Sequence, residues 1–212
     1  MEKQILGSFI FVLASHLRGL MVLRLDLFSL KLCALLHDIG KPKCWAESRR
    51  FSDHIYYTYE VLEENIDSRL AKIAMRHHTN ERYYRGNTPS TDEEWLVAIA
   101  DKIATGMERA LEPDVVKKGP PIDLVFPLSR KEEPLVMRRL HRKDLMLIHE
   151  SVSAVIREAC MAQGSPEDLF RRIYEGLERG RPSALSLHDV PADTRPPLND
   201  HSLWSHMKMT SA

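Results

Sequence analysis

The sequence contains few cysteines, and their positions exclude two kinds of crosslink. Cys33, Cys44 and Cys160 are odd in number, lie far apart and form no Cys-x-x-Cys pair. A disulfide framework needs paired cysteines and a thiolate zinc site needs closely spaced ones, so neither is expected. This cysteine usage favours the reducing environment of the cytoplasm.

The chain also lacks an excess of charge of either sign. Its 30 basic residues are matched by 30 acidic ones. A bulk positive field that would by itself attract nucleic acid is therefore excluded. Any contact with nucleic acid must come from a local patch or from a partner subunit.

No apolar run is long enough to cross a membrane. Residues 5–17 are apolar, but a transmembrane helix needs about 20 such residues. Arg18, Arg24 and Asp26 follow within the same helical pattern, and no basic leader or cleavage site is recognisable. We expect a core helix here, with His16 as one of its core residues.

Period-2 alternation, the mark of β-strands, is almost absent. Apolar residues recur at helical spacing through most of the chain, which predicts an all-α helical bundle. One proline-rich stretch contains the apolar piece 124–126, and we expect a small, isolated strand near residues 122–128. The motif Thr91 to Glu94 predicts a capping box that opens a helix towards Leu111, and Ser165-Pro166 predicts another helix start.

The distribution of prolines suggests three parts. Residues 1–180 form the main domain, residues 181–198 form a proline-rich connection, and residues 199–212 form a terminal helix capped by Asn199 or Asp200. The terminal helix carries Leu203, His206, Met207 and Thr210 on one side. Because no helix-ending signal follows, we expect the sequence to be part of a longer parent protein.

The clearest chemical signal is His37-Asp38-Ile39-Gly40-Lys41, after which Gly40 and Pro42 are expected to close a helix. Further candidates lie at helical positions beside apolar residues: His54, His77, His78 and Asp101. Each of them taken alone is more simply explained as a hydrogen-bonded core residue. Together, so many buried polar groups would be costly unless they converge on a cation.

The types of ligand narrow the choice of cation. Imidazole and carboxylate ligands suit one or two divalent transition-metal ions, with Mn, Ni or Co favoured and Mg or Zn as alternatives. Such a centre can activate water for attack on phosphorus. In this mechanism Asp38 is catalytic, and Lys41 offsets charge on the phosphoryl oxygens. The alternative for Lys41 is a solvated side chain just after a helix end.

Four stretches carry a resemblance to a known family: Leu35 to Lys41, Arg76 to His78, Ala98 to Arg109, and Pro191 to Pro196 leading into Leu203 to His206. In these stretches the chain resembles the HD nuclease domain at the N-terminus of the large, polymerase-like subunit of type III CRISPR–Cas effector complexes. The family's HD domain is circularly permuted, so the histidine that other HD enzymes carry first would here be His206. Without the resemblance, nothing in its local pattern distinguishes His206, and His201 is a weaker candidate.

The resemblance implies a ligand set and an activity. His37, Asp38, Asp101 and His206 would form the first metal site, while His54, His77 and His78 would form or border the second, with Asp38 bridging them. The implied activity is cleavage of single-stranded DNA in antiviral defence, triggered when the complex binds target RNA through its guide RNA. The implied partners are the DNA strand and the other subunits of the complex.

Local contacts to the strand would come from Arg76, Arg82 and Arg85, and Tyr83 and Tyr84 beside them are suited to stack on unpaired bases. The alternative is an ordinary solvated loop. Two further functional interpretations stay open. The same metal chemistry would serve an HD-type nucleotide phosphohydrolase, which needs an enclosed pocket. The chain would otherwise be a catalytically silent scaffold domain of the complex.

Overall fold

The computed structural model describes residues 25–105, 120–128, 135–180, 185–194 and 200–212. The expected helix around residues 5–17, with His16, lies outside these residues. The elements, in chain order, are α2 (Leu27–Leu36), α3 (Lys41–Ala46), the 3-10 turn η1 (Phe51–Asp53), α4 (His54–Asn65), α5 (Ser68–Met75), α6 (Asp92–Thr105), β1 (Ile122–Val125), β2 (Val136–Leu140), α7 (Arg142–Met161), α8 (Pro166–Arg179) and α9 (Leu203–Ser211).

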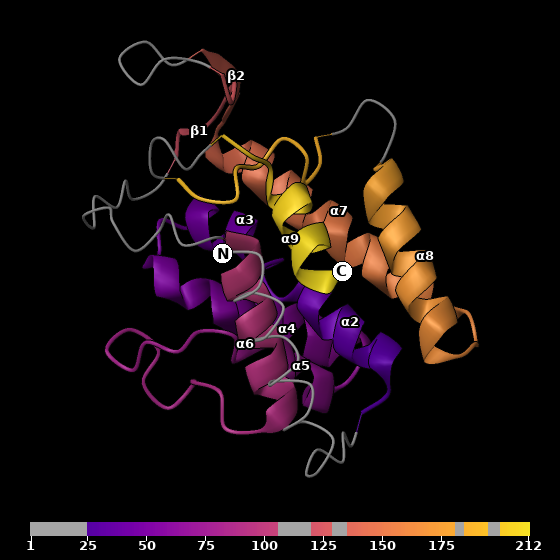
Figure 1. The fold of residues 1–212 in the computed structure, drawn as a ribbon. Helices are drawn as coiled ribbons and strands as arrows, with labels where there is room; N and C mark the ends of the chain where they lie inside the picture. Colours follow the sequence, from indigo (N-terminus) through magenta and orange to yellow (C-terminus); the bar gives the residue numbers. More distant parts are fainter. Residues whose placement is uncertain (1–24, 106–119, 129–134, 181–184, 195–199) are drawn as a thin grey trace, which may run out of the picture.

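Helices make up most of the fold, and the all-α class predicted from the sequence is confirmed. A helical body with one small two-stranded sheet is consistent with the HD domain that the resemblance implies. Figure 1 shows α7 and α8 on one side of the bundle and α6 on the other, with α9 between them. Among the residues described, no helix is both long enough and apolar enough to cross a membrane.

Helix α2 is the centre of the bundle because its second half is apolar on all sides. Its last five residues, Leu32 to Leu36, are all buried, as expected for a helix surrounded by others. It packs against α5, α6, α8 and α9. Asp26 caps its start, accepting a hydrogen bond from the backbone N–H of Ser29 at 2.9 Å. The helix therefore ends at a fixed place in the interior, and His37 is its C-cap.

The predicted capping box at Thr91 and the predicted helix start at Ser165-Pro166 are both present. Glu94 accepts from the backbone N–H of Thr91 at 3.1 Å and donates its own backbone N–H to Thr91 Oγ1 at 3.3 Å. At the start of α8, Ser165 and Asp168 make the reciprocal pair, with Pro166 at the first helical position. The described part of α6 ends at Thr105, and Leu111 lies outside the described residues.

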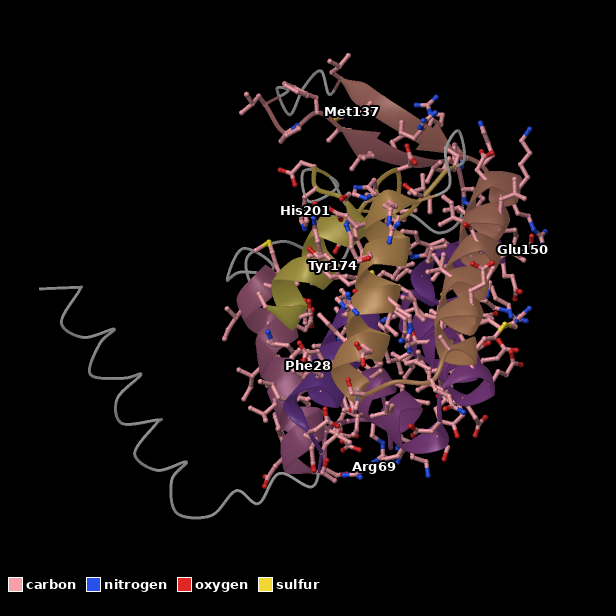
Figure 2. All side chains as sticks on the ribbon, turned by 90° about the vertical axis from the view of Figure 1, so that its right-hand side faces the viewer. Phe28, Arg69, Met137, Glu150, Tyr174 and His201 are labelled. Atoms are coloured by element: carbon pink, nitrogen blue, oxygen red, sulfur yellow. The ribbon has the colours of Figure 1, made fainter. Side chains whose placement is uncertain are left out.

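The strand predicted near residues 122–128 exists but is not isolated. β1 pairs antiparallel with β2, from Ile122 opposite Leu140 to Val125 opposite Val136. This two-stranded ribbon projects from one end of the helical body (Figure 1), and Figure 2 shows Met137 on it. The second strand was missed because Val136 to Leu140 carries exposed arginines and shows no alternation of burial.

The C-terminal part of the chain belongs to the core. Leu187, Val190 and Ala192 are buried, and Pro191 forms an isolated antiparallel bridge with Ser202. The predicted cap at Asn199 or Asp200 is wrong, because Ser202 accepts from the N–H of Ser205 and is the N-cap of α9. The bridge fixes where α9 begins. The four residues predicted to lie on one side of this helix, Leu203, His206, Met207 and Thr210, are buried.

Candidate metal centre

Side chains from three helix regions meet at the C-terminal end of α2. His37 comes from the α2 cap, Asp101 from α6 and His206 from α9. The Nε2 atoms of His37 and His206 are 3.1 Å apart. Asp38 Oδ2 lies 3.2 Å from the first and 3.3 Å from the second. Asp101 Oδ1 lies 3.6 Å from His37 Nε2 and 3.2 Å from His206 Nε2. These four residues form the first group.

A second group adjoins the first through Asp38. Its other oxygen, Oδ1, lies 3.1 Å from His54 Nε2 and 3.6 Å from His77 Nε2. His78 Nε2 lies 3.2 Å from His54 Nε2. Asp38 thus turns one carboxylate oxygen towards each group. His77 and His78 do not lie on a helix as predicted, since α5 ends at Met75 and Arg76 is its C-cap.

Backbone carbonyls fix the orientation of three imidazoles. His37 donates its Nδ1–H to Ala34 O at 2.7 Å, and His77 donates in the same way to Ala74 O at 2.7 Å. His54 donates to Phe51 O at 2.5 Å. Each bond reaches back three residues and makes Nδ1 the donor to a carbonyl, so that Nε2 faces inward.

The charges of the centre follow from burial and from neighbouring groups. Burial by itself raises the pKa of Asp38, but Lys41 and His37 outweigh it and hold that pKa well below its ordinary value. Hydrogen bonds from His206 and His37 likewise outweigh burial and keep the pKa of Asp101 low. Burial, with His37 nearby, lowers the pKa of His77 to about 3. Burial by itself lowers the pKa of His37, but Asp38 and Asp101 outweigh it and raise that pKa to about 9. The centre therefore combines ionised carboxylates with a charged imidazole at His37 and a neutral one at His77.

The donor set fits divalent metal ions. Neighbouring ligands of an ion held at about 2.0–2.2 Å are themselves separated by about 3.0–3.5 Å. The triangle of His37 Nε2, His206 Nε2 and Asp38 Oδ2 has sides of 3.1, 3.2 and 3.3 Å. Asp38 Oδ1 is buried and has no hydrogen-bond partner among the residues that the structure describes. Buried donor atoms at such distances are costly unless a proton or a cation lies between them, and both groups can hold a metal ion.

Lys41 is bound within the centre and is not solvated. Its side chain is 11% exposed, and Nζ lies 2.5 Å from Asp38 Oδ2. The same ammonium group donates to Ala192 O at 2.9 Å. Lys41 therefore holds Asp38 ionised and ties the segment before α9 to the His-Asp motif.

Gly40 and Thr58 shape the turn that carries the motif. Thr58 Oγ1 accepts from Gly40 N at 3.1 Å and donates to His37 O at 3.0 Å. Gly40 does not adopt a left-handed conformation, since its φ is −76°. Its role is close approach, because an added Cβ would lie 2.1 Å from His54 O and 2.5 Å from Thr58 N.

Replacing Gly40 by Ala is therefore expected to destabilise the protein by at least about 3 kcal/mol, since the backbone of α4 would have to move. Gly86→Ala is the control: its φ is +76°, but an added Cβ meets nothing within 4 Å, so about 1–2 kcal/mol is expected. Urea denaturation measures both. Equal stability of the two variants would contradict the role assigned to Gly40.

The remaining residues predicted to act in the site differ in exposure and in their contacts. The side chain of His201 is 40% exposed and pairs with Asp200 at 3.0 Å. Arg76 is held by Glu94 at 3.2 Å and by Ser90. Arg82 and Arg85 are exposed. Contacts of the three arginines with nucleic acid stay predictions.

Two contributors were missed from the sequence. Thr58 lies four residues after His54 on the same helix, and this spacing was the available signal. The sequence predicts Tyr84 as a surface aromatic, but it is 5% exposed and stacks on His78 with ring centroids 4.1 Å apart. No sequence pattern indicated that inward orientation.

Comparison with known proteins gives a match to one protein family. Residues 8–106 match the family model described as HD domain, so an HD domain is found in this part of the chain. HD domains are metal-dependent hydrolases. The matched range contains His37, Asp38 and Asp101, whereas His206 lies beyond it. A search of curated proteins finds no match to the chain.

Proposed function

We propose that this chain is a metal-dependent phosphodiesterase that cleaves single-stranded DNA. The observation that carries the proposal is the position of Asp38 between two groups of ligands, with Oδ2 3.2 Å from His37 Nε2 and Oδ1 3.1 Å from His54 Nε2. A carboxylate shared in this way is suited to a pair of ions. Paired ions stabilise both the attacking and the leaving oxygens of an in-line displacement at phosphorus.

The protein's own residues have separate tasks. Ala34 and Ala74 hold the imidazoles of His37 and His77 by their carbonyl groups, which preorganises the donors. Lys41 keeps Asp38 ionised and adds positive charge beside the centre. When bound, divalent ions supply Lewis acidity and lower the pKa of the attacking water.

We further propose that the chain is the HD nuclease part of the large subunit of a type III CRISPR complex in the cytoplasm. The support is the resemblance in four stretches together with the topology of the first group. Its fourth member, His206, comes from α9 at the far end of the sequence, 3.1 Å from His37. A permuted HD domain has this arrangement. The guide RNA and the other subunits of the complex are the proposed partners.

The test of the activity uses protein stripped of metal with a chelator and reloaded with Mn²⁺, Ni²⁺ or Co²⁺. We expect single-stranded DNA to be cut only after reloading, and Asp101→Asn to be much less active. Hydrolysis of nucleotides with oligonucleotides left intact would reject the nuclease and favour the nucleotide phosphohydrolase. Failure to bind or use any metal would favour the scaffold interpretation.

The test of the assignment to the complex is reconstitution with guide-loaded subunits. DNA cleavage should increase when target RNA is added, and a guide with an unrelated sequence is the control. A chain that neither joins the complex nor responds to target RNA would contradict this part of the proposal without affecting the metal chemistry.

A further inference from the structure

A cluster of aromatic rings adjoins the second ligand group. Tyr84 stacks on His78 with an interplanar angle of 25°. Phe51 lies 6.3 Å from Tyr84 and 5.5 Å from Tyr83, measured between ring centroids. The rings therefore form a continuous series from the candidate metal centre to the surface.

The outer members of this series are accessible. Phe51 is 38% exposed and Tyr83 is 39% exposed, whereas Tyr84 beneath them is 5% exposed. We call Phe51 and Tyr83 the aromatic platform. Exposed aromatic rings with a buried ring behind them present π-surface to a ligand on a rigid support.

The position of the platform is fixed relative to the centre. Phe51 O accepts the Nδ1–H of His54 at 2.5 Å, so the residue that carries one platform ring also orients a candidate ligand. Tyr84 lies between the platform and His78 as a single layer of rings. A group stacked on the platform would therefore sit beside the second ligand group.

Positive charge accompanies the platform. The guanidinium carbon of Arg82 lies 5.6 Å from the ring centroid of Tyr83, and Arg85 is exposed on the same loop. Exposed arginines beside stacking aromatics are a combination that binds single-stranded nucleic acid, with the rings taking bases and the cations taking phosphates.

We propose that Phe51 and Tyr83 bind an unpaired nucleobase adjacent to the phosphodiester held at the His54 side of the centre. This proposal rests on the proposed function and deepens it by assigning a base-binding subsite. A base in a duplex has its faces covered by its neighbours in the stack, whereas an unpaired base can leave the stack and lie on the platform. The subsite would thus favour single strands without reading sequence.

Binding of a labelled short DNA strand to the full chain, measured by fluorescence anisotropy with chelator present, tests the subsite apart from catalysis. Tyr83→Ala and Phe51→Ala should each weaken binding about tenfold, while Tyr83→Phe should bind like the wild type. Trp95→Ala is the matched control, because Trp95 is a 45% exposed aromatic on α6 outside the cluster.

The same strand with one base removed at each position in turn gives the sharper test. One abasic position should weaken binding to the wild type about tenfold and should cause no further loss with Tyr83→Ala, because the stacking partner is already gone. The subsite would be overturned if an abasic site at every position weakened binding equally in the wild type and in Tyr83→Ala. Equal effects of Trp95→Ala and Tyr83→Ala on binding would overturn it as well. If the protein cleaves DNA with metal but no abasic position weakens binding more than the others, the subsite alone is rejected. If one abasic position does weaken binding but no metal supports cleavage, the proposed function alone is rejected.

Discussion

Replacing Asp38 by Asn is expected to reduce DNA cleavage by more than about 100-fold. Losing a residue that only supports a metal ligand already costs up to about 100-fold, and Asp38 is proposed as a ligand itself. Asp38 belongs to both ligand groups, so one substitution weakens both. The amide presents one neutral oxygen and an NH₂ group where two anionic oxygens stood. Metal content after dialysis and the rate of cleavage under saturating metal measure the effect.

Asp123→Asn is the matched control for Asp38→Asn. Asp123 pairs with Arg139 on the β-ribbon at 2.7 Å, away from the centre, and its loss should leave cleavage and metal content unchanged. Circular dichroism should show that both variants are folded, since Asn has nearly the shape of Asp. An Asp38→Asn protein that retains wild-type metal content and cleavage would remove the basis of the proposed mechanism.

Replacing His206 by Gln is expected to have an effect of similar size, a loss of cleavage of about 100-fold or more. Nε2 of His206 lies within 3.3 Å of His37, Asp38 and Asp101, so its loss opens the first group from the side of α9. Gln retains a polar side chain in the buried position, which limits the loss of stability. Cleavage and metal content are measured as for Asp38→Asn.

His201→Gln provides the comparison for His206→Gln. His201 is the other histidine of the C-terminal segment, and Figure 2 shows it at the end of α9 that faces the ribbon. Its exposed side chain pairs with Asp200, outside both ligand groups. Loss of cleavage in His201→Gln with normal cleavage in His206→Gln would reverse the assignment and contradict the permuted first group.

The helical class and two helix starts could be predicted because their signals are local. The capping box at Thr91 and the helix start at Ser165-Pro166 depend on residues close together in sequence, and the structure contains both. The cap of α9 could not be predicted in this way. Asn199, Asp200 and Ser202 are all good capping residues, and the bridge between Pro191 and Ser202, a tertiary contact, determines which of them begins the helix.

The candidate centre was predictable only where neighbours in sequence are neighbours in space. His37 and Asp38 are adjacent, and each residue's role as a donor follows from its type. The position of His206, 169 residues from His37 in sequence, came from the family resemblance, since its surroundings resemble those of any buried helical residue. His77 and His78 were expected on a helix because the apolar stripe of α5 continues to them, but the helix ends at Met75.

The aromatic platform likewise could not be predicted from the sequence. Tyr83 and Tyr84 are adjacent in a loop, and a sequence cannot tell which ring turns inward. The stack of Tyr84 on His78 decides it, and Phe51 joins from a turn far away in sequence. Contacts between loops depend on the packing of the helices that carry them.

We expect His37, Asp38 and His206 to hold one cation between them. The most direct test is anomalous diffraction from crystals of the protein soaked in Mn²⁺. We expect an anomalous peak about 2.0–2.2 Å from His37 Nε2, Asp38 Oδ2 and His206 Nε2. Soaked crystals in which these three side chains carry no peak, or in which His206 points away from the His-Asp pair, would contradict the account.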